Sequence, residues 1–134
     1  MIRLALAILL LPVSALAHET EQKCMAKTLY HEARSESLNG QYQVAAVIIN
    51  RVASRRFPNT VCGVVNQPHQ FSPNRNQPMV DPQARTLALT IAKDILTSIL
   101  PDERPLYFHS PMPSLPRWAR KLKPVFVIGE HTFY

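Results

Sequence analysis

The sequence has 134 residues, of which 46% are hydrophobic, and a formal net charge of +6 at pH 7. This length allows one domain with one modest core and little else. The basic excess favours an anionic partner, a cell-wall polymer or a membrane surface, although charge alone equally allows a merely soluble basic surface. Nucleic acid is disfavoured as a partner, because no basic stripe is interleaved with aromatic residues.

The N-terminus has the three parts of a secretory signal peptide. Arg3 supplies a positive charge, residues 4–16 form an apolar run, and residues 15–17 read Ala-Leu-Ala, a small-residue cleavage pattern. The apolar run is shorter than the roughly 20 residues that a membrane-spanning helix needs. We therefore expect cleavage after residue 17, export to the periplasm or the exterior, and no stable membrane insertion of residues 18–134. The alternative is a short membrane tether.

A first helix is expected over about residues 19–37, ended by Asn39-Gly40. With Leu29 at the centre of its apolar face, a rotation of about 100° per residue places Glu32 and Glu36 on or beside that face. This helix also contains Cys24. With Cys62 it forms an even pair in an exported chain, which indicates a disulfide that stabilises by roughly 3–4 kcal/mol. Two free buried thiols are the alternative.

A second helix, over about residues 41–54, is apolar on nearly every side and is expected at the centre of the domain. Within it, Asn50 and Arg51 need polar partners. Val61–Val65 reads as a short buried strand or turn. A long polar loop follows, and a third helix is expected from residue 82 or 83 to 100.

Two later apolar segments, residues 106–111 and 124–134, can pair as a small β-hairpin or ribbon. The predicted fold is therefore mainly α, in the α+β class, with one small domain. We expect the protein to be a monomer.

Two carboxylates on a buried-facing stripe cost several kcal/mol unless they are paired or protonated. One interpretation is an ion pair with Arg51. The other is a carboxyl group that stays protonated near neutral pH and acts as a general acid, as in glycosidic bond cleavage.

A zinc site is the rival hypothesis, because His31, His69, His109 and His131 are available together with Glu32. No H-E-x-x-H or H-x-x-E-H pattern is present, and adjacent His and Glu residues project about 100° apart on a helix. We therefore expect neither a metal nor another cofactor. The serines also lack the G-x-S-x-G context of a nucleophile.

Several motifs together resemble one known family. They are "AKTLYHEARSES", "GQYQVAAVIINRVASRRFPNTVCGVV", "QFS", "YFHSP", a tryptophan and the closing "IGEHTFY". In this order and spacing, from about Cys24 to Tyr134, they are similar to the SleB-type cell wall hydrolases, the catalytic domains of spore-cortex-lytic enzymes.

The resemblance implies a lysozyme-like, mainly helical fold. It also implies cleavage of peptidoglycan between N-acetylmuramic acid and N-acetylglucosamine. Glu32 matches the catalytic acid/base of the family, and Glu36 matches a second acidic position that tunes Glu32, stabilises positive charge or holds a water. Ser35 stands where the family usually has glycine, and Glu130 where asparagine is common. The residues expected to bind substrate or brace the groove are Gln70, Phe71, Tyr107, His109, Trp118, His131 and Tyr134.

The expected reaction is that of a lytic transglycosylase with Glu32 as its single acid/base. A muramidase that leaves reducing ends and a non-catalytic wall-binding protein are the alternatives.

Overall fold

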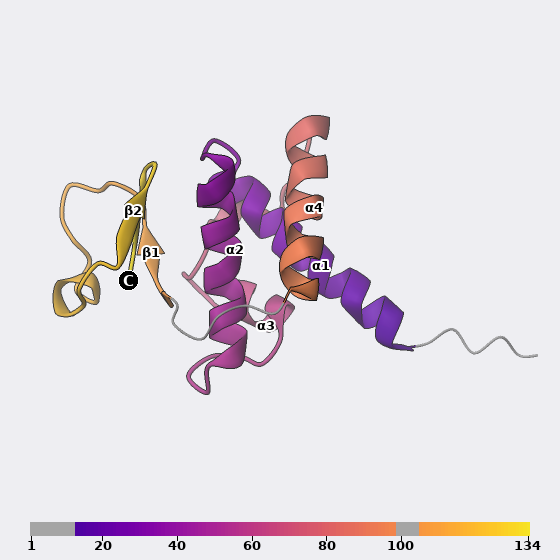
Figure 1. The fold of residues 1–134 in the computed structure, drawn as a ribbon, viewed down its shortest axis with the longest axis horizontal. Coiled ribbons are helices and arrows are strands. Elements are labelled where there is room, and N and C mark those ends of the chain that lie inside the picture. Colours follow the sequence, from indigo (N-terminus) through magenta and orange to yellow (C-terminus); the bar gives the residue numbers. More distant parts are fainter. Residues whose placement is uncertain (1–12, 99–104) are drawn as a thin grey trace, which may run out of the picture.

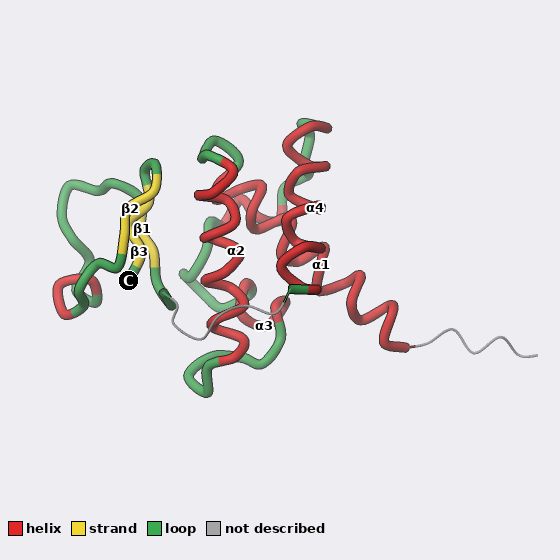
Figure 2. Tube along the Cα trace, in the orientation of Figure 1, coloured by secondary structure: helices red, strands yellow, loops and turns green. Residues whose placement is uncertain are grey.

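The computed structural model describes residues 13–98 and 105–134. This part of the chain is mainly helical, and a small sheet lies beyond α2 at one end (Figure 1). Figure 2 shows that the strands are confined to this end. The predicted mainly α class is confirmed. The elements are α1 (Val13–Ala33), α2 (Leu38–Ala53), α3 (Val61–Val65), α4 (Pro82–Thr97), β1 (Phe108–His109), β2 (Phe126–Ile128) and β3 (His131–Phe133).

The core lies between α1, α2, α3 and α4 and continues to the inner face of the sheet. Leu29 of α1, Ile48 of α2 and Ile91 of α4 are fully buried in it, as is Phe133 of β3. The strongly apolar α2 lies between the other long helices and the sheet, which explains why nearly all its sides are apolar (Figure 1). None of the described helices combines the length and the apolar character needed to cross a membrane.

The boundary between the first two helices differs from the prediction. Helix α1 ends at Ala33, so Glu36 lies in the connection rather than one helical turn beyond Glu32. Ser37 caps α2, and its hydroxyl accepts a hydrogen bond from Gly40 N at 3.2 Å. Asn39-Gly40 therefore belongs to the first turn of α2 and does not end α1. The start of α1 at Val13 falls inside the predicted signal peptide, whose residues 1–12 lie outside the described residues.

The short element α3 is a helix, and its prediction as a strand or turn was wrong. Thr60 accepts a hydrogen bond from Gly63 N at 3.0 Å, and the Glu21 carboxylate of α1 accepts one from Val61 N. These two caps satisfy amide groups that a helix start leaves open. The predicted disulfide is confirmed: Cys24 and Cys62 join α1 to α3 with a Cα–Cα distance of 5.3 Å.

Helix α4 ends at Thr97, where Ser98 N bonds to Ile95 O, and so stops short of the predicted end at residue 100. Its N-terminus is capped by Asp81, whose carboxylate accepts hydrogen bonds from Gln83 N and Ala84 N.

The C-terminal sheet confirms the predicted ribbon and adds one strand. Its order is β1-β3-β2, and both pairs are antiparallel. Phe126 and Ile128 of β2 pack against the core, so Val127 between them faces outward. Gly129 makes the β2–β3 turn with a φ of 56°, a conformation that suits glycine.

Candidate functional site

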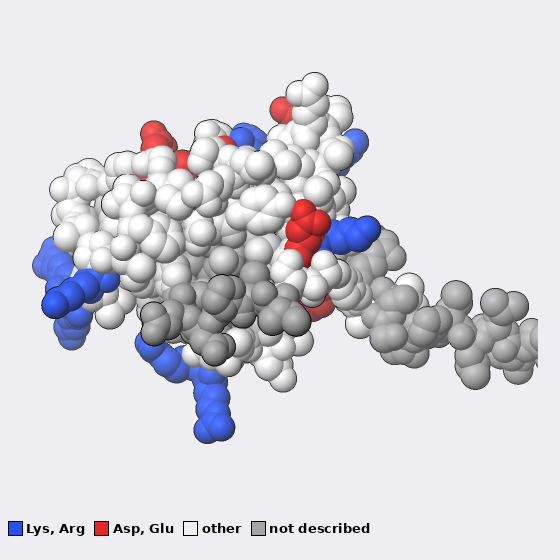
Figure 3. Space-filling view, viewed as in Figure 1, with Lys and Arg blue, Asp and Glu red and all other residues white. Residues whose placement is uncertain are grey.

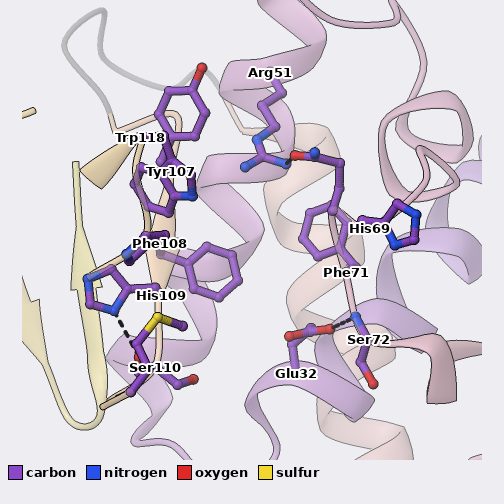
Figure 4. Close-up of a pocket in the computed structure, with 13 residues that line it drawn as sticks. Glu32, Arg51, His69, Phe71, Ser72, Tyr107, Phe108, His109, Ser110 and Trp118 are labelled. Carbon is purple, nitrogen blue, oxygen red and sulfur yellow. Dashed lines mark hydrogen bonds between the residues drawn. The ribbon is translucent and has the colours of Figure 1, made fainter. Parts of the chain in front are cut away.

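A groove of about 420 Å³ lies where the helical part meets the sheet (Figure 4). This volume is within the range typical of ligand sites. Its walls come from the end of α1, from α2, from the loop after α3 and from the C-terminal segment. The lining residues are Glu32, Arg51, His69, Gln70, Phe71, Ser72, Tyr107, Phe108, His109, Ser110, Met112, Pro116 and Trp118.

Within the part of the chain that the structure describes, Glu32 is the only carboxylate that lines this groove. It comes from the last turn of α1, is half-buried, and accepts a hydrogen bond on Oε1 from Ser72 N (Figure 4). The Ser72 hydroxyl in turn accepts from Asn74 N at 3.2 Å and caps the short 3₁₀ helix η1 (Pro73–Asn76). The hydrogen bond from Ser72 N thus holds one oxygen of Glu32, and Oε2 can meet a ligand.

Arg51 is buried at the back of the groove and does not pair with Glu32. Its Nε donates to Leu106 O at 2.7 Å and a terminal nitrogen donates to Gln70 Oε1 at 3.2 Å. The guanidinium lies over the rings of Phe71 and Tyr107, at 5.3 and 5.5 Å from their centroids. Burial lowers the pKa of Arg51, and Tyr107 partly offsets this, but a guanidinium stays charged in proteins. The ion pair considered from the sequence is therefore absent, and Arg51 links the groove walls.

Aromatic side chains form the wall on the sheet side. Tyr107 and Trp118 stack with centroids 5.2 Å apart, and Trp118 meets Tyr134 edge-on at 5.3 Å. His109 Nδ1 bonds to Ser110 O at 2.8 Å, and a carbonyl can only accept. Nδ1 therefore donates to that carbonyl, and Nε2 forms a hydrogen bond with the Tyr134 hydroxyl at 3.0 Å. Tyr134 lies outside the lining and orients His109 and Trp118.

Glu36 also lies outside the groove lining. Its Oε2 accepts a hydrogen bond from Glu130 N at 3.2 Å, in the turn between β2 and β3. A Cβ atom at Gly129 would lie 2.0 Å from the same oxygen. Glu36 therefore attaches the β2–β3 turn of the sheet to the connection before α2.

His131, predicted to bind substrate, is buried behind the groove. Its ring meets Phe108 edge-on at 5.0 Å, and its Nδ1 has no hydrogen-bond partner among the described residues. Burial lowers the pKa of His131, while Glu36, Glu32 and Glu130 partly oppose this change. The ring is therefore neutral at pH 7, and it supports Phe108 rather than touching a ligand in the groove.

Of the residues predicted for the site, the structure brings six into the groove lining and leaves three outside. Ser72, which belongs to the quoted "QFS" motif, also lines the groove. The lining residues that sequence reasoning did not assign to the site are Arg51, His69, Phe108, Ser110, Met112 and Pro116. His69 has a φ of 59°, which few non-glycine residues adopt, and nothing in its sequence context signals this. Within residues 13–98 and 105–134, no three His, Cys, Asp or Glu side chains form a cluster that fits a metal ion. The six predicted site residues that line the groove are Glu32, Gln70, Phe71, Tyr107, His109 and Trp118.

Comparison with known proteins identifies relatives of this chain. The family model described as "Cell Wall Hydrolase" matches residues 35–134. The spore cortex-lytic enzyme of Bacillus cereus is 34% identical over 119 residues, which cover 86% of this chain and 44% of that enzyme. The spore cortex-lytic enzyme of Bacillus subtilis (strain 168) is 32% identical over 111 residues, 83% of this chain and 36% of that enzyme. The chain thus spans less than half of these relatives.

Solved structures agree with this result. The catalytic domain of the germination-specific lytic transglycosylase SleB from Bacillus anthracis has a TM-score of 0.71 and 32% identity. The match covers 86% of this chain and 93% of that one. The catalytic domain of the Bacillus cereus SleB protein has a TM-score of 0.67 and 31% identity, covering 86% and 89%. The predicted SleB-type resemblance and its lysozyme-like fold are confirmed. The chain belongs to the cell wall hydrolase family.

Proposed function

We propose that this protein cleaves the glycan strand of peptidoglycan between N-acetylmuramic acid and N-acetylglucosamine, as a lytic transglycosylase with Glu32 as its single acid/base. The observation that carries the proposal is that Glu32 is the single carboxylate among the described residues that line the groove. Hydrolysing glycosidases usually flank the bond with two carboxyl groups, about 5–5.5 Å or 6.5–9.5 Å apart. Here Glu36, which would be the second, contacts Glu130 N instead. One acid is enough when the sugar supplies its own nucleophile.

The reaction then proceeds without a catalytic water. Glu32 donates a proton from Oε2 to the glycosidic oxygen, and the bond from that oxygen to the anomeric carbon of muramic acid breaks. The positive charge that develops there is met by the acetamido oxygen of the same sugar, as in substrate-assisted glycosidases. The Glu32 carboxylate next takes the proton of the C6 hydroxyl, whose oxygen bonds to the anomeric carbon. The product is a 1,6-anhydro sugar, and Glu32 is protonated again.

The remaining groove residues fit a sugar chain. Tyr107 and Trp118 present a stacked aromatic pair, on which the apolar face of a sugar ring can pack. Gln70 and Ser110 offer polar groups beside this wall. Such a mixture of flat apolar faces and polar groups fits the sugar rings of a glycan strand.

The first experiment is mass spectrometry of purified peptidoglycan digested with the purified chain and with Glu32→Gln. We expect anhydromuramoyl products from the parent chain. Loss of a general acid costs about 10²–10⁴-fold in rate, so the variant should give almost none. Glu130→Gln, which removes an exposed carboxylate, is the matched control. Circular dichroism checks that each variant is folded.

The other outcomes decide between the alternatives. Products heavier by one water would make the protein a muramidase and require a water held near Glu32. Equal cleavage by Glu32→Gln would refute the assignment of the acid. Binding without cleavage by the parent chain would leave a wall-binding protein.

We further propose that the chain is exported and loses residues 1–17. Cleavage after Ala17 would remove the first residues of α1 but keep Cys24 and Glu32, which lie further along it. The intact mass of the protein recovered from the periplasm or medium tests this, and an uncut mass would contradict it.

A further inference from the structure

The segment that leads from the groove to β2 carries a concentrated positive charge. Between residues 115 and 127 it has four basic side chains and no acidic one. All four are exposed, on or beside the short 3₁₀ helix η2 (Ala119–Lys121). Figure 3 shows Lys and Arg side chains gathered in the lower part of the end of the molecule where this segment lies in Figure 1, whereas acidic side chains are visible in the upper part of that end. The four are Arg117, Arg120, Lys121 and Lys123.

Large apolar side chains are exposed in the same segment. Leu115 and Leu122 are 49% and 41% exposed, and Val125 and Val127 are both 63% exposed. The two valines alternate with the core-packed Phe126 and Ile128, so they share the outer side of β2. Single exposed apolar residues are ordinary on protein surfaces. Packing against the core does not explain why four exposed apolar side chains lie next to four basic ones. We call these eight residues the C-terminal patch.

Basic and apolar groups on one surface, without acids, are what an anionic bilayer binds. The cations meet lipid phosphates, and the apolar groups enter the boundary between headgroups and acyl chains. Peptide carboxylates of the cell wall would match the charge but would leave the exposed leucines and valines without a role. We propose that the C-terminal patch docks this protein reversibly on an anionic phospholipid surface. This inference does not depend on the glycan-cleaving activity.

The test is sedimentation of the purified chain with vesicles of phosphatidylglycerol and phosphatidylcholine, beside vesicles of phosphatidylcholine alone. We expect binding to the anionic vesicles that weakens with added salt. Each basic residue near such a surface contributes about fivefold in affinity, so Lys121→Glu/Lys123→Glu should bind at least ~25-fold more weakly. Both lysines are exposed, and circular dichroism checks that the variant is folded. Val127→Thr, which keeps a β-branched shape, should weaken binding several-fold.

The matched control is Arg85→Glu/Lys93→Glu, which makes the same change of net charge on exposed positions of α4. All variants keep residues 4–16, so that apolar run contributes equally to every comparison. The proposal is overturned if the anionic vesicles do not bind the chain, or if the control loses as much affinity as the patch variant. It is also overturned if the patch variant keeps its vesicle binding but loses sedimentation with peptide-bearing peptidoglycan. The patch would then be a wall-binding surface.

Discussion

Glu32 and Glu36 are close in the chain, yet each has a different partner. Glu32 faces the groove and is held by Ser72 N, whereas Glu36 turns to Glu130 N on the sheet. The difference follows from the end of α1 at Ala33, which releases Glu36 from the helical repeat. A carboxylate four positions beyond another shares its helix face only while the helix continues.

His131 makes the stability of the protein depend on pH. Because burial lowers the pKa of this imidazole in the folded protein, the unfolded chain binds its proton more readily, with a pKa of about 6.5. Stability should therefore be fully present above about pH 6.5 and fall as the pH drops toward the lowered value. His131→Asn should show a flatter dependence in denaturant unfolding between about pH 5 and 8.

His18→Asn is the control for this measurement, because His18 is exposed. It should keep the parent slope. If His131→Asn keeps that slope too, the neutral buried imidazole is not the source of the dependence.

At the scale of elements, the sequence predicted the features that a strong apolar pattern or an even number of cysteines indicates. The continuous apolar character of α2, the apolar side of α4 and the pairing of Cys24 with Cys62 are confirmed. The placement of Glu32 on the groove followed from its helix face together with the family resemblance.

Other features depend on contacts that no local pattern contains. The short apolar pattern of Val61–Val65 is compatible with a buried strand and with a short helix. The helical form of α3 depends on the Thr60 cap and on the hydrogen bond to Glu21 of α1. The start of α2 is decided by Ser37. The place of Arg51 depends on Leu106 and Gln70, which approach it only in the folded chain.

The β2–β3 turn offers a prediction at this scale. Gly129→Ala should lower the free energy of unfolding by about 1–2 kcal/mol or more, because its φ is positive and its Cβ would clash with the Glu36 carboxylate. Glu36→Ala alone should cost about 1 kcal/mol through the lost hydrogen bond. The measurement is denaturant unfolding of both single variants and the double variant.

In the double variant the clash is absent, so its loss should be smaller than the sum of the two single losses by roughly 1 kcal/mol. Strict additivity would show that Glu36 and the turn do not interact.

At the scale of the whole molecule, the groove lies at the interface between the helical part and the small sheet. Glu32 and Ser72 belong to the helical part, and Tyr107 and Trp118 belong to the C-terminal segment (Figure 4). Arg51 bridges them through Leu106 O. The site therefore exists only in the complete fold, and stability and activity should be lost together on unfolding.

The disulfide sets part of that global stability. Cys24 and Cys62 are separated by 38 positions, so reduction should lower the free energy of unfolding by roughly 3–4 kcal/mol in the chain-entropy model. Thermal unfolding with and without reductant measures this. Equal melting temperatures would mean that the crosslink is absent or contributes nothing.

Gly40 and Gly129, where the sheet packs against α2 and Glu36, also matter for protein engineering. A Cβ at Gly40 would lie 3.5 Å from Ile128 Cγ2 and 3.2 Å from Glu36 Cβ, and one at Gly129 would overlap the Glu36 carboxylate. A C-terminal ribbon transplanted from a relative should therefore pack on this helical part when the donor turn leaves space for the Glu36 side chain. Chimeras should be designed with positions 36, 40 and 129 exchanged together, although position 129 is far from the other two in the gene.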